Sequence, residues 1–197
     1  MNLDTINKIV IHLPERVDRL ERTMDGISKF FENHEVTFIE GVRELPVFKG
    51  IAQAHLNAIR HAQEQGWPEV LIMEDDVNFQ SKNSRSHADK CFSQIPDNWD
   101  LLLSSVYTSK GLTQYNGFWS QTKEFCGLTW YVVNQRAYDK ILTFDKSMNI
   151  DRAMATAIGL NCFVVNEFFA IQYEGFSDNV NRKVNYDNLL GRFDVLK

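Results

Sequence analysis

The sequence predicts an α/β fold, in which helices flank a central sheet of mostly parallel strands. Short apolar runs with many β-branched residues recur along the first half of the chain, as buried strands require. Stretches with helical apolar spacing separate these runs. Strand, helix, strand, helix and strand therefore follow one another between residues 8 and 76. This order implies right-handed crossovers onto a parallel sheet.

The first strand is predicted over residues 8–13, a β-branched run that Pro14 closes. A helix is predicted next, because its apolar side chains are three or four residues apart and form one buried face. The side chains of this face are Val17, Leu20, Met24, Ile27 and Phe31. A second short strand is predicted over residues 36–42.

The second helix is predicted over residues 50–66, with an apolar side that includes His55 and an end at Gly66. The third strand is predicted over residues 69–73, and three consecutive carboxylates follow it at 74–76. The strand is apolar throughout, as expected for one that is buried on both faces of a parallel sheet.

The pattern is looser after residue 79. A Gly- and aromatic-bearing excursion over residues 108–124 is predicted to be a hairpin or a loop. Residues 81–90 are expected to be a surface loop or the start of a helix that ends near residue 95. The other expected elements are strands over 99–106, 125–134, 161–166 and 168–173, and helices over 135–146 and 149–160. No Ser-, Gly- or Pro-rich linker divides the chain, so we expect a single domain.

Composition and charge exclude several classes of protein. The chain has 44% hydrophobic residues and a net charge of −5, which suits a packed globular protein. It has no basic stripe, so we expect no nucleic-acid binding and at most peripheral contact with a membrane. Cys91, Cys126 and Cys162 lie far apart and indicate reduced thiols. Without a signal-peptide pattern or an apolar run of roughly eighteen residues, the protein is expected to be cytoplasmic.

The consecutive carboxylates Glu74, Asp75 and Asp76 need an explanation, because adjacent anions repel one another more strongly as water is excluded. Either water solvates all three in a surface loop, or a cation lies beside them. They follow a strand that should be buried, and ligands collect at the carboxyl ends of such strands. We therefore predict a metal site, and carboxylate oxygens favour Mg²⁺ or Mn²⁺ over zinc.

Other motifs give weaker signals. The histidines are scattered, and both His12 and His55 are expected to pack in the interior. The chain contains no phosphate-binding P-loop, no dinucleotide-binding glycine motif and no serine-hydrolase turn. Arg16 and Arg19 follow the first strand closely enough to reach a phosphate, with solvated or paired arginines as the alternative. The aromatic stretch 115–119 is either ordinary packing or a wall that stacks on an acceptor sugar.

Residues 9–23, IVIHLPERVDRLERT, resemble the opening of glycosyltransferase family 25, the lipopolysaccharide and procollagen β-galactosyltransferase group. That family begins with a strand and an N-L-x-x-R-x-D-R pattern. This chain has His12 where the family often has Asn. The positions that match the pattern are Leu13, Arg16, Asp18 and Arg19.

Further blocks resemble the same family and occur in the same order. Residues 50–79 are similar to its Ser-His-Leu helix, which a strand and Glu-Asp-Asp follow. Ala54 replaces the Ser, whereas His55 and Leu56 match. The later blocks are WDLLLSS, GLTWYVVNQRAYDKIL, NIDRAMA and FFAIQYEGFSDN. The resemblance covers nearly the whole chain.

The resemblance implies a GT-A fold, with a Rossmann-like nucleotide-sugar-binding half over about residues 1–107 and an acceptor half over about residues 108–197. It also implies transfer of a sugar, often galactose from UDP-galactose, with Mn²⁺ or Mg²⁺ and with inversion at the anomeric carbon. The acceptor would be a hydroxyl of a glycan, of a lipopolysaccharide-type glycolipid or of a protein.

The resemblance also implies roles for individual residues. Asp76 is expected to bind the metal, with Glu74 as a second ligand or a contact to the ribose. Asp151 is expected to be the general base, and a helix N-cap is the alternative. Other candidates are Glu174 and Asp178 for the base or a metal contact, and Gln172 for the metal or donor. The residues expected to contact the donor are Leu13, Pro14, Arg16, Arg19, Val42, Arg43, Glu74 and Asp75, the last also supporting the turn.

Two other functions stay open at this point. A Mg²⁺-dependent phosphohydrolase on a related sheet would need an Asp nucleophile directly after the first strand, where this chain has Leu13, Pro14 and Glu15. A non-catalytic module that binds nucleotide sugars or glycans would have a similar site without turnover.

Overall fold

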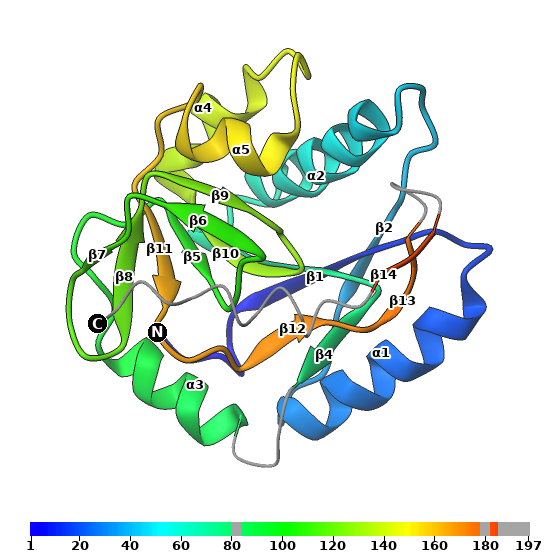
Figure 1. Cartoon of the computed structure of the whole chain (residues 1–197). Coiled ribbons are helices and arrows are strands. Elements are labelled where there is room, and N and C mark those ends of the chain that lie inside the picture. The colour runs from blue at the N-terminus through cyan, green and yellow to red at the C-terminus, as the bar shows by residue number, and fades with distance from the viewer. Residues whose placement is uncertain (80–83, 178–181, 185–197) are drawn as a thin grey trace.

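A computed structural model gives the structure of residues 1–79, 84–177 and 182–184, in which helices cover both faces of a central sheet (Figure 1). The sheet has the strand order β2-β1-β3-β10-β5-β11-β8-β7. Its strands are β1 (Asn7–His12), β2 (Thr37–Glu40), β3 (Glu69–Glu74), β5 (Leu101–Leu103), β7 (Thr113–Gln114), β8 (Trp119–Thr122), β10 (Trp130–Asn134) and β11 (Cys162–Val165). Only β8 and β10 run opposite to the other strands of this sheet, so the predicted mixed, mostly parallel sheet is confirmed.

Two helical layers bury the two faces of the sheet (Figure 1). One layer contains α1 (Val17–Phe30) and α3 (Ser84–Ser93). The other contains α2 (Val47–Glu64), α4 (Tyr138–Leu142) and α5 (Ile150–Ala155), and a 3₁₀ turn (Gln135–Ala137) precedes α4. Each face of the sheet therefore has its own apolar core.

Strand β3 is apolar throughout because both of its faces are buried. Leu71 and Met73 pack into the core under α1 and α3. Val70 and Ile72 point the other way, into the core under α2, α4 and α5. All four side chains are fully buried, so neither face of this strand can carry a polar residue without a partner.

The predicted apolar face of the first helix is not buried at the start of the helix. Ile27 and Phe31 are buried as expected, but Val17 is 57% exposed. Val17 is the first residue of α1, so the first turn lies outside the core. Thr23 is buried instead, because its hydroxyl donates a hydrogen bond to the backbone oxygen of Asp75 at 2.6 Å.

The remaining strands form short antiparallel pairs. These pairs are β4 (Val77–Phe79) with β12 (Ala170–Gln172), β6 (Thr108–Lys110) with β9 (Glu124–Cys126), and β13 (Gly175–Ser177) with β14 (Arg182–Val184). Residues 108–124 were predicted to be a hairpin or a loop, and the antiparallel pairs show that they belong to hairpins. Within this segment, β8 joins the central sheet, and Trp119 is fully buried with its indole Nε1 donating to the backbone oxygen of Cys91.

Helix α2 lies close to the segment that follows β2. A Cβ placed on the buried Gly50 would be 2.2 Å from the backbone oxygen of Val42, which is far inside van der Waals contact. Only glycine therefore allows this approach, which brings Val42 and α2 to the same end of the sheet. Across the described residues, no helix is long and apolar enough to cross a membrane.

Candidate active site

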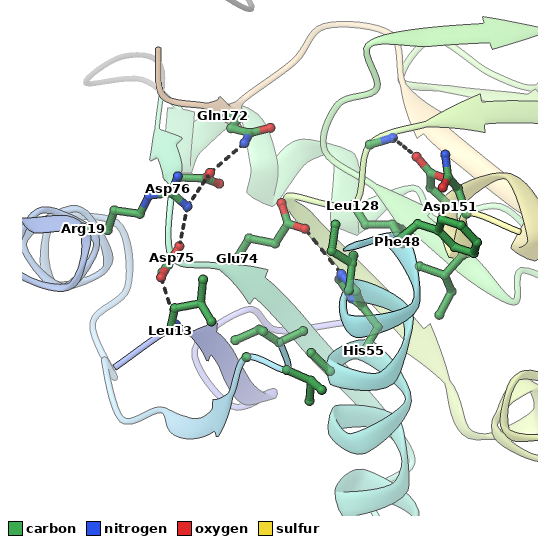
Figure 2. A pocket seen from close by; sticks show the side chains of 18 of the residues that line it. Leu13, Arg19, Phe48, His55, Glu74, Asp75, Asp76, Leu128, Asp151 and Gln172 are labelled. Atoms are coloured by element: carbon green, nitrogen blue, oxygen red, sulfur yellow. Dashed lines mark hydrogen bonds and ion pairs between the residues drawn. The ribbon is translucent and has the colours of Figure 1, made fainter. Parts of the chain in front are cut away.

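A cavity of about 230 Å³ lies at the carboxyl ends of β1 and β3. Its walls come from the ends of these strands, the segment after β2, helices α2 and α5, and β12 (Figure 2). The predicted site residues that line it are Leu13, Arg19, Val42, Glu74, Asp75, Asp76, Asp151 and Gln172. The fold therefore brings together residues that are far apart in the sequence.

Asp75 is tied into the structure on several sides. Its Oδ2 lies 2.8 Å from Nδ1 of His12 and accepts a bond from the backbone N–H of Leu13 at 3.3 Å. Its Oδ1 accepts a bond from Arg19 at 3.0 Å, and its backbone oxygen accepts from Thr23. These donors satisfy Asp75 and hold it at the turn between β3 and β4.

Asp76 is buried but only half satisfied. Its Oδ2 accepts hydrogen bonds from Arg19 at 3.1 Å and from the amide of Gln172 at 2.6 Å. Its Oδ1 is buried without a hydrogen-bond partner among the described residues. Burial, and next the charge of Glu74, raise the pKa of Asp76 to about 7, although Arg19 acts in the opposite direction. An orphaned buried carboxylate oxygen is a position that a cation would stabilise.

Glu74 is the last residue of β3 and extends into the same cavity (Figure 2). Its backbone N–H donates to the carbonyl oxygen of Thr129 at 2.9 Å, which fixes the strand end. Its Oε1 lies 3.3 Å from Nε2 of His55, and the other ring nitrogen of His55 lies 2.7 Å from the hydroxyl of Tyr131. Glu74 and Asp76 therefore present two carboxylates to one cavity.

The donor atoms at this position fit Mg²⁺ or Mn²⁺. Within residues 1–79, 84–177 and 182–184, no group of three or more His, Cys, Asp or Glu side chains is arranged to hold a metal ion. Asp76, with or without Glu74, would therefore supply one or two ligands. Such ions are commonly held by one or two carboxylates, with water and substrate phosphates as the other ligands.

Asp151 lies across the cavity from Asp76, beside Phe48 (Figure 2). Its Oδ2 accepts a hydrogen bond from the backbone N–H of Gly127 at 3.0 Å, and its Oδ1 accepts one from Arg152 N–H at 2.7 Å. The N-cap residue of α5 is Asn149, and Asp151 is the second residue of the helix. The alternative that Asp151 is the cap is therefore wrong, and its carboxylate is held at the cavity wall.

Several residues predicted for the site lie outside the cavity lining. Pro14 is exposed, and Arg16 is bonded through its Nε to Asp18 at 3.0 Å. Arg43 is exposed and ion-paired with Glu15. Glu174 is exposed and does not line the cavity, and Asp178 lies outside the described residues. The two arginines are held by nearby carboxylates, which explains why they do not extend into the cavity.

The sequence did not predict that His12, His55 and Tyr107 contact residues of the site. His12 contacts Asp75 and His55 contacts Glu74, whereas both were expected only to pack. Tyr107 lines the cavity, and its hydroxyl bonds to Thr129 at 2.9 Å and to the amide oxygen of Gln172. A histidine inside an otherwise apolar helix face was the one available signal for His55. The aromatic residues 115–119 do not line the cavity, and Trp119 belongs to the core.

No family model matches the chain, and no curated protein matches it either. Solved structures do resemble it. Protein A197 from STIV has a TM-score of 0.55 and 9% identity, over 91% of this chain and 92% of that one. A mannosyltransferase from Pyrobaculum calidifontis, PcManGT, solved with GDP-Man and Mn²⁺, has a TM-score of 0.52 and 12% identity, over 89% of this chain and 58% of that one. An inositol-1-phosphate CTP transferase from T. maritima has a TM-score of 0.49 and 10% identity, over 93% and 95%.

The two likenesses with a TM-score above 0.5 show the fold. As predicted, the chain has a GT-A-like, Rossmann-like mixed α/β fold with a mostly parallel central sheet, and the mannosyltransferase shares this fold. At such low identity, fold alone does not carry an activity, which has to be argued from the site. Membership of family 25 stays a prediction.

Proposed function

We propose that the protein is a metal-dependent glycosyltransferase that moves a sugar from a nucleotide-sugar donor to a hydroxyl acceptor. The observation that carries this proposal is the buried Asp76, whose Oδ1 lacks a partner among the described residues and which shares a cavity with Glu74 at the carboxyl end of β3. This is the end of an α/β sheet at which ligands bind.

Two further observations support the proposal. A mannosyltransferase of the same fold was solved with GDP-Man and Mn²⁺, so the fold accommodates a nucleotide sugar and a divalent cation. The resemblance to family 25 favours UDP-galactose as the donor, inversion at the anomeric carbon, and a glycan, glycolipid or protein acceptor. It also favours a nucleotide-sugar half over about residues 1–107 and an acceptor half over about 108–197.

The residues of the cavity have distinct proposed tasks. Leu13 and Val42 line the donor side, and Arg19 adds positive charge beside the diphosphate. Asp76 and Glu74 would hold Mn²⁺ or Mg²⁺, which when bound neutralises charge on the departing diphosphate. Asp151 would accept the proton of the acceptor hydroxyl, and the backbone N–H groups of Gly127 and Arg152 orient its carboxylate.

The proposal is tested by measuring thermal unfolding with a set of nucleotide sugars, with and without Mn²⁺. One nucleotide sugar is expected to stabilise the wild-type protein only when Mn²⁺ is present, by about 2.7 kcal/mol at a ligand concentration of roughly 100 times Kd. Asp76→Ala is expected to lose both this stabilisation and sugar transfer. It should still fold, because Arg19 keeps its hydrogen bond to Asp75 and burial makes the Asp76 carboxylate costly in the folded protein.

Asp25→Ala is the matched control, because Asp25 is an exposed carboxylate of α1 that pairs with Lys29. It should bind and transfer like wild type. Transfer by Asp76→Ala near the wild-type rate would show that the metal assignment is wrong. Donor binding without release of the nucleotide, with many acceptors present, would identify a non-catalytic binding module instead. Release of free phosphate from monoesters would identify a phosphohydrolase.

A further inference from the structure

His55 is a buried histidine that connects the core to the cavity. It belongs to α2, is 1% exposed and lines the cavity wall. Its Nδ1 lies 2.7 Å from the hydroxyl of Tyr131 on β10, and its Nε2 lies 3.3 Å from Oε1 of Glu74 (Figure 2). One imidazole on α2 therefore contacts two other elements of the fold, β10 and β3.

The partners of the ring determine which nitrogen carries its proton. Tyr131 is fully buried, and burial together with the charge of Glu74 raises its pKa well above the usual value. The phenol therefore keeps its proton and can donate it to Nδ1. In neutral imidazole one nitrogen accepts and the other donates, so Nε2–H is left to donate to the carboxylate of Glu74.

We propose that His55 is a positioning residue, which holds the Glu74 carboxylate toward the cavity through Nε2–H, and that Tyr131 sets the tautomer that makes this possible. The inference rests on the proposed function, because Glu74 matters there as a ligand of the metal or of its bound water. Groups that orient metal ligands in this way typically affect metal affinity by about 10- to 100-fold.

An ordinary packing role does not explain the same contacts. The neighbouring positions on this side of α2 are apolar, as in Ala52, Leu56 and Ile59, and all of them are buried. A leucine in place of His55 would continue this apolar surface without any need for a partner. The imidazole instead satisfies its two nitrogens with a buried phenol and with a carboxylate of the cavity.

The first test measures Mn²⁺ binding without nucleotide, by the electron paramagnetic resonance signal of free Mn²⁺. His55→Leu/Tyr131→Phe removes both members of the buried hydrogen bond, which leaves neither partner unsatisfied. We expect this variant to bind Mn²⁺ at least about 10-fold more weakly than wild type, with a similar midpoint of thermal unfolding. His55→Gln keeps an N–H donor on the side of Glu74 and should recover most of the affinity.

His61→Leu is the matched control, because His61 is on the same helix but packs its ring against Trp67, away from the cavity lining. It should bind Mn²⁺ like wild type. If the double variant does not fold, the Mn²⁺ affinity of Tyr131→Phe alone is compared with that of wild type. This variant loses only the hydroxyl that bonds to His55. If the double variant, or Tyr131→Phe where the double variant does not fold, bound Mn²⁺ as tightly as wild type, the inference would be overturned.

The second test is ¹⁵N NMR of labelled histidine in the metal-free protein. We expect His55 to be protonated at Nε2 in wild type and to become a mixture of tautomers in Tyr131→Phe. A wild-type ring protonated at Nδ1 alone would overturn the inference while leaving the proposed function intact. Wild-type protein that binds no Mn²⁺ either alone or in the presence of nucleotide sugars would refute the proposed function and, with it, the positioning role.

Discussion

Two neighbouring carboxylates, Asp75 and Asp76, have opposite environments. Asp75 is saturated by donors from β1 and α1, whereas Asp76 keeps one buried oxygen without a partner in the described structure. The run of carboxylates predicts a metal site at this position, and only the resemblance separates the two residues, with Asp76 expected to bind the metal and Asp75 to support the turn. The difference arises from Gln172 and Arg19, which approach Asp76 on one oxygen only.

Asp151 allows the role of general base to be tested at the scale of a single residue. Asp151→Asn preserves the shape of the side chain and can still accept from a backbone N–H. We expect it to keep donor affinity, measured by titration calorimetry, and to lose at least about 100-fold in kcat, because a general base commonly contributes that much. The measurement is nucleotide release at saturating donor.

Asp139→Asn serves as its control, because Asp139 is likewise the second residue of a helix, α4, but is exposed and outside the cavity lining. Its kcat should stay unchanged. If Asp151→Asn lost donor affinity and kcat to the same extent, the carboxylate would instead have a structural role at the start of α5.

At the scale of elements, local patterns predict most helices and strands but not their pairing. The apolar runs of β1, β2 and β3 and the helices between them are found from periodicity, and their parallel order is confirmed. The antiparallel insertion of β10 between β3 and β5 was not predicted. An apolar run specifies burial on both faces, but it contains no information about the direction of the neighbouring strand.

The same limit explains which parts of the site were found. Glu74, Asp75 and Asp76 are recognisable because three carboxylates directly follow an apolar run in the sequence. Gln172 reaches Asp76 from 96 residues away, because β12 pairs with β4 and places Gln172 opposite Val77. Gln172 was a candidate only through the resemblance, because its contact with Asp76 depends on the tertiary pairing of these two short strands.

Gly50 gives a prediction about the packing of α2. Alanine in the interior of a helix normally stabilises by up to about 1 kcal/mol relative to glycine. Here the added Cβ would lie 2.2 Å from the backbone oxygen of Val42, so the segment after β2 must move. We expect Gly50→Ala to lower the free energy of unfolding by about 2 kcal/mol, as overpacking does, in urea denaturation.

Gly117→Ala is the comparison for this change, because a Cβ there meets nothing within 4 Å. Its stability should stay within about 0.5 kcal/mol of wild type. Val42 lines the cavity, so Gly50→Ala should also weaken donor binding. A Gly50→Ala protein more stable than wild type would mean that α2 can move away without loss.

At the scale of the whole molecule, one ion pair connects the segments that cover a face of the sheet. Arg85 on α3 bonds to the carboxylate of Asp4, which precedes β1, with one N–O distance of 2.9 Å. The same guanidinium donates to the backbone oxygen of Phe30 at the end of α1 and lies near its ring. The Asp4 side chain is only 19% exposed, so solvent screens this pair less than an open surface pair.

This ion pair predicts a pH-dependent stability. The hydrogen bond from Arg85 lowers the pKa of Asp4 from its usual 3.8 to about 2. A lowered carboxylate pKa contributes stability above the pKa of the unfolded chain, and the contribution is lost as the pH falls toward the folded value. Asp4→Asn should therefore cost about 1 kcal/mol at pH 7, after a reduction for solvent screening. In urea denaturation, the loss of unfolding free energy in Asp4→Asn should stay constant down to about pH 4 and shrink as the pH falls toward about 2.

Asp25→Asn is the control, because it breaks the exposed pair with Lys29. It should change the free energy of unfolding by no more than about 0.5 kcal/mol at any pH. A deficit of Asp4→Asn that did not shrink at low pH would show that its carboxylate acts through shape rather than charge.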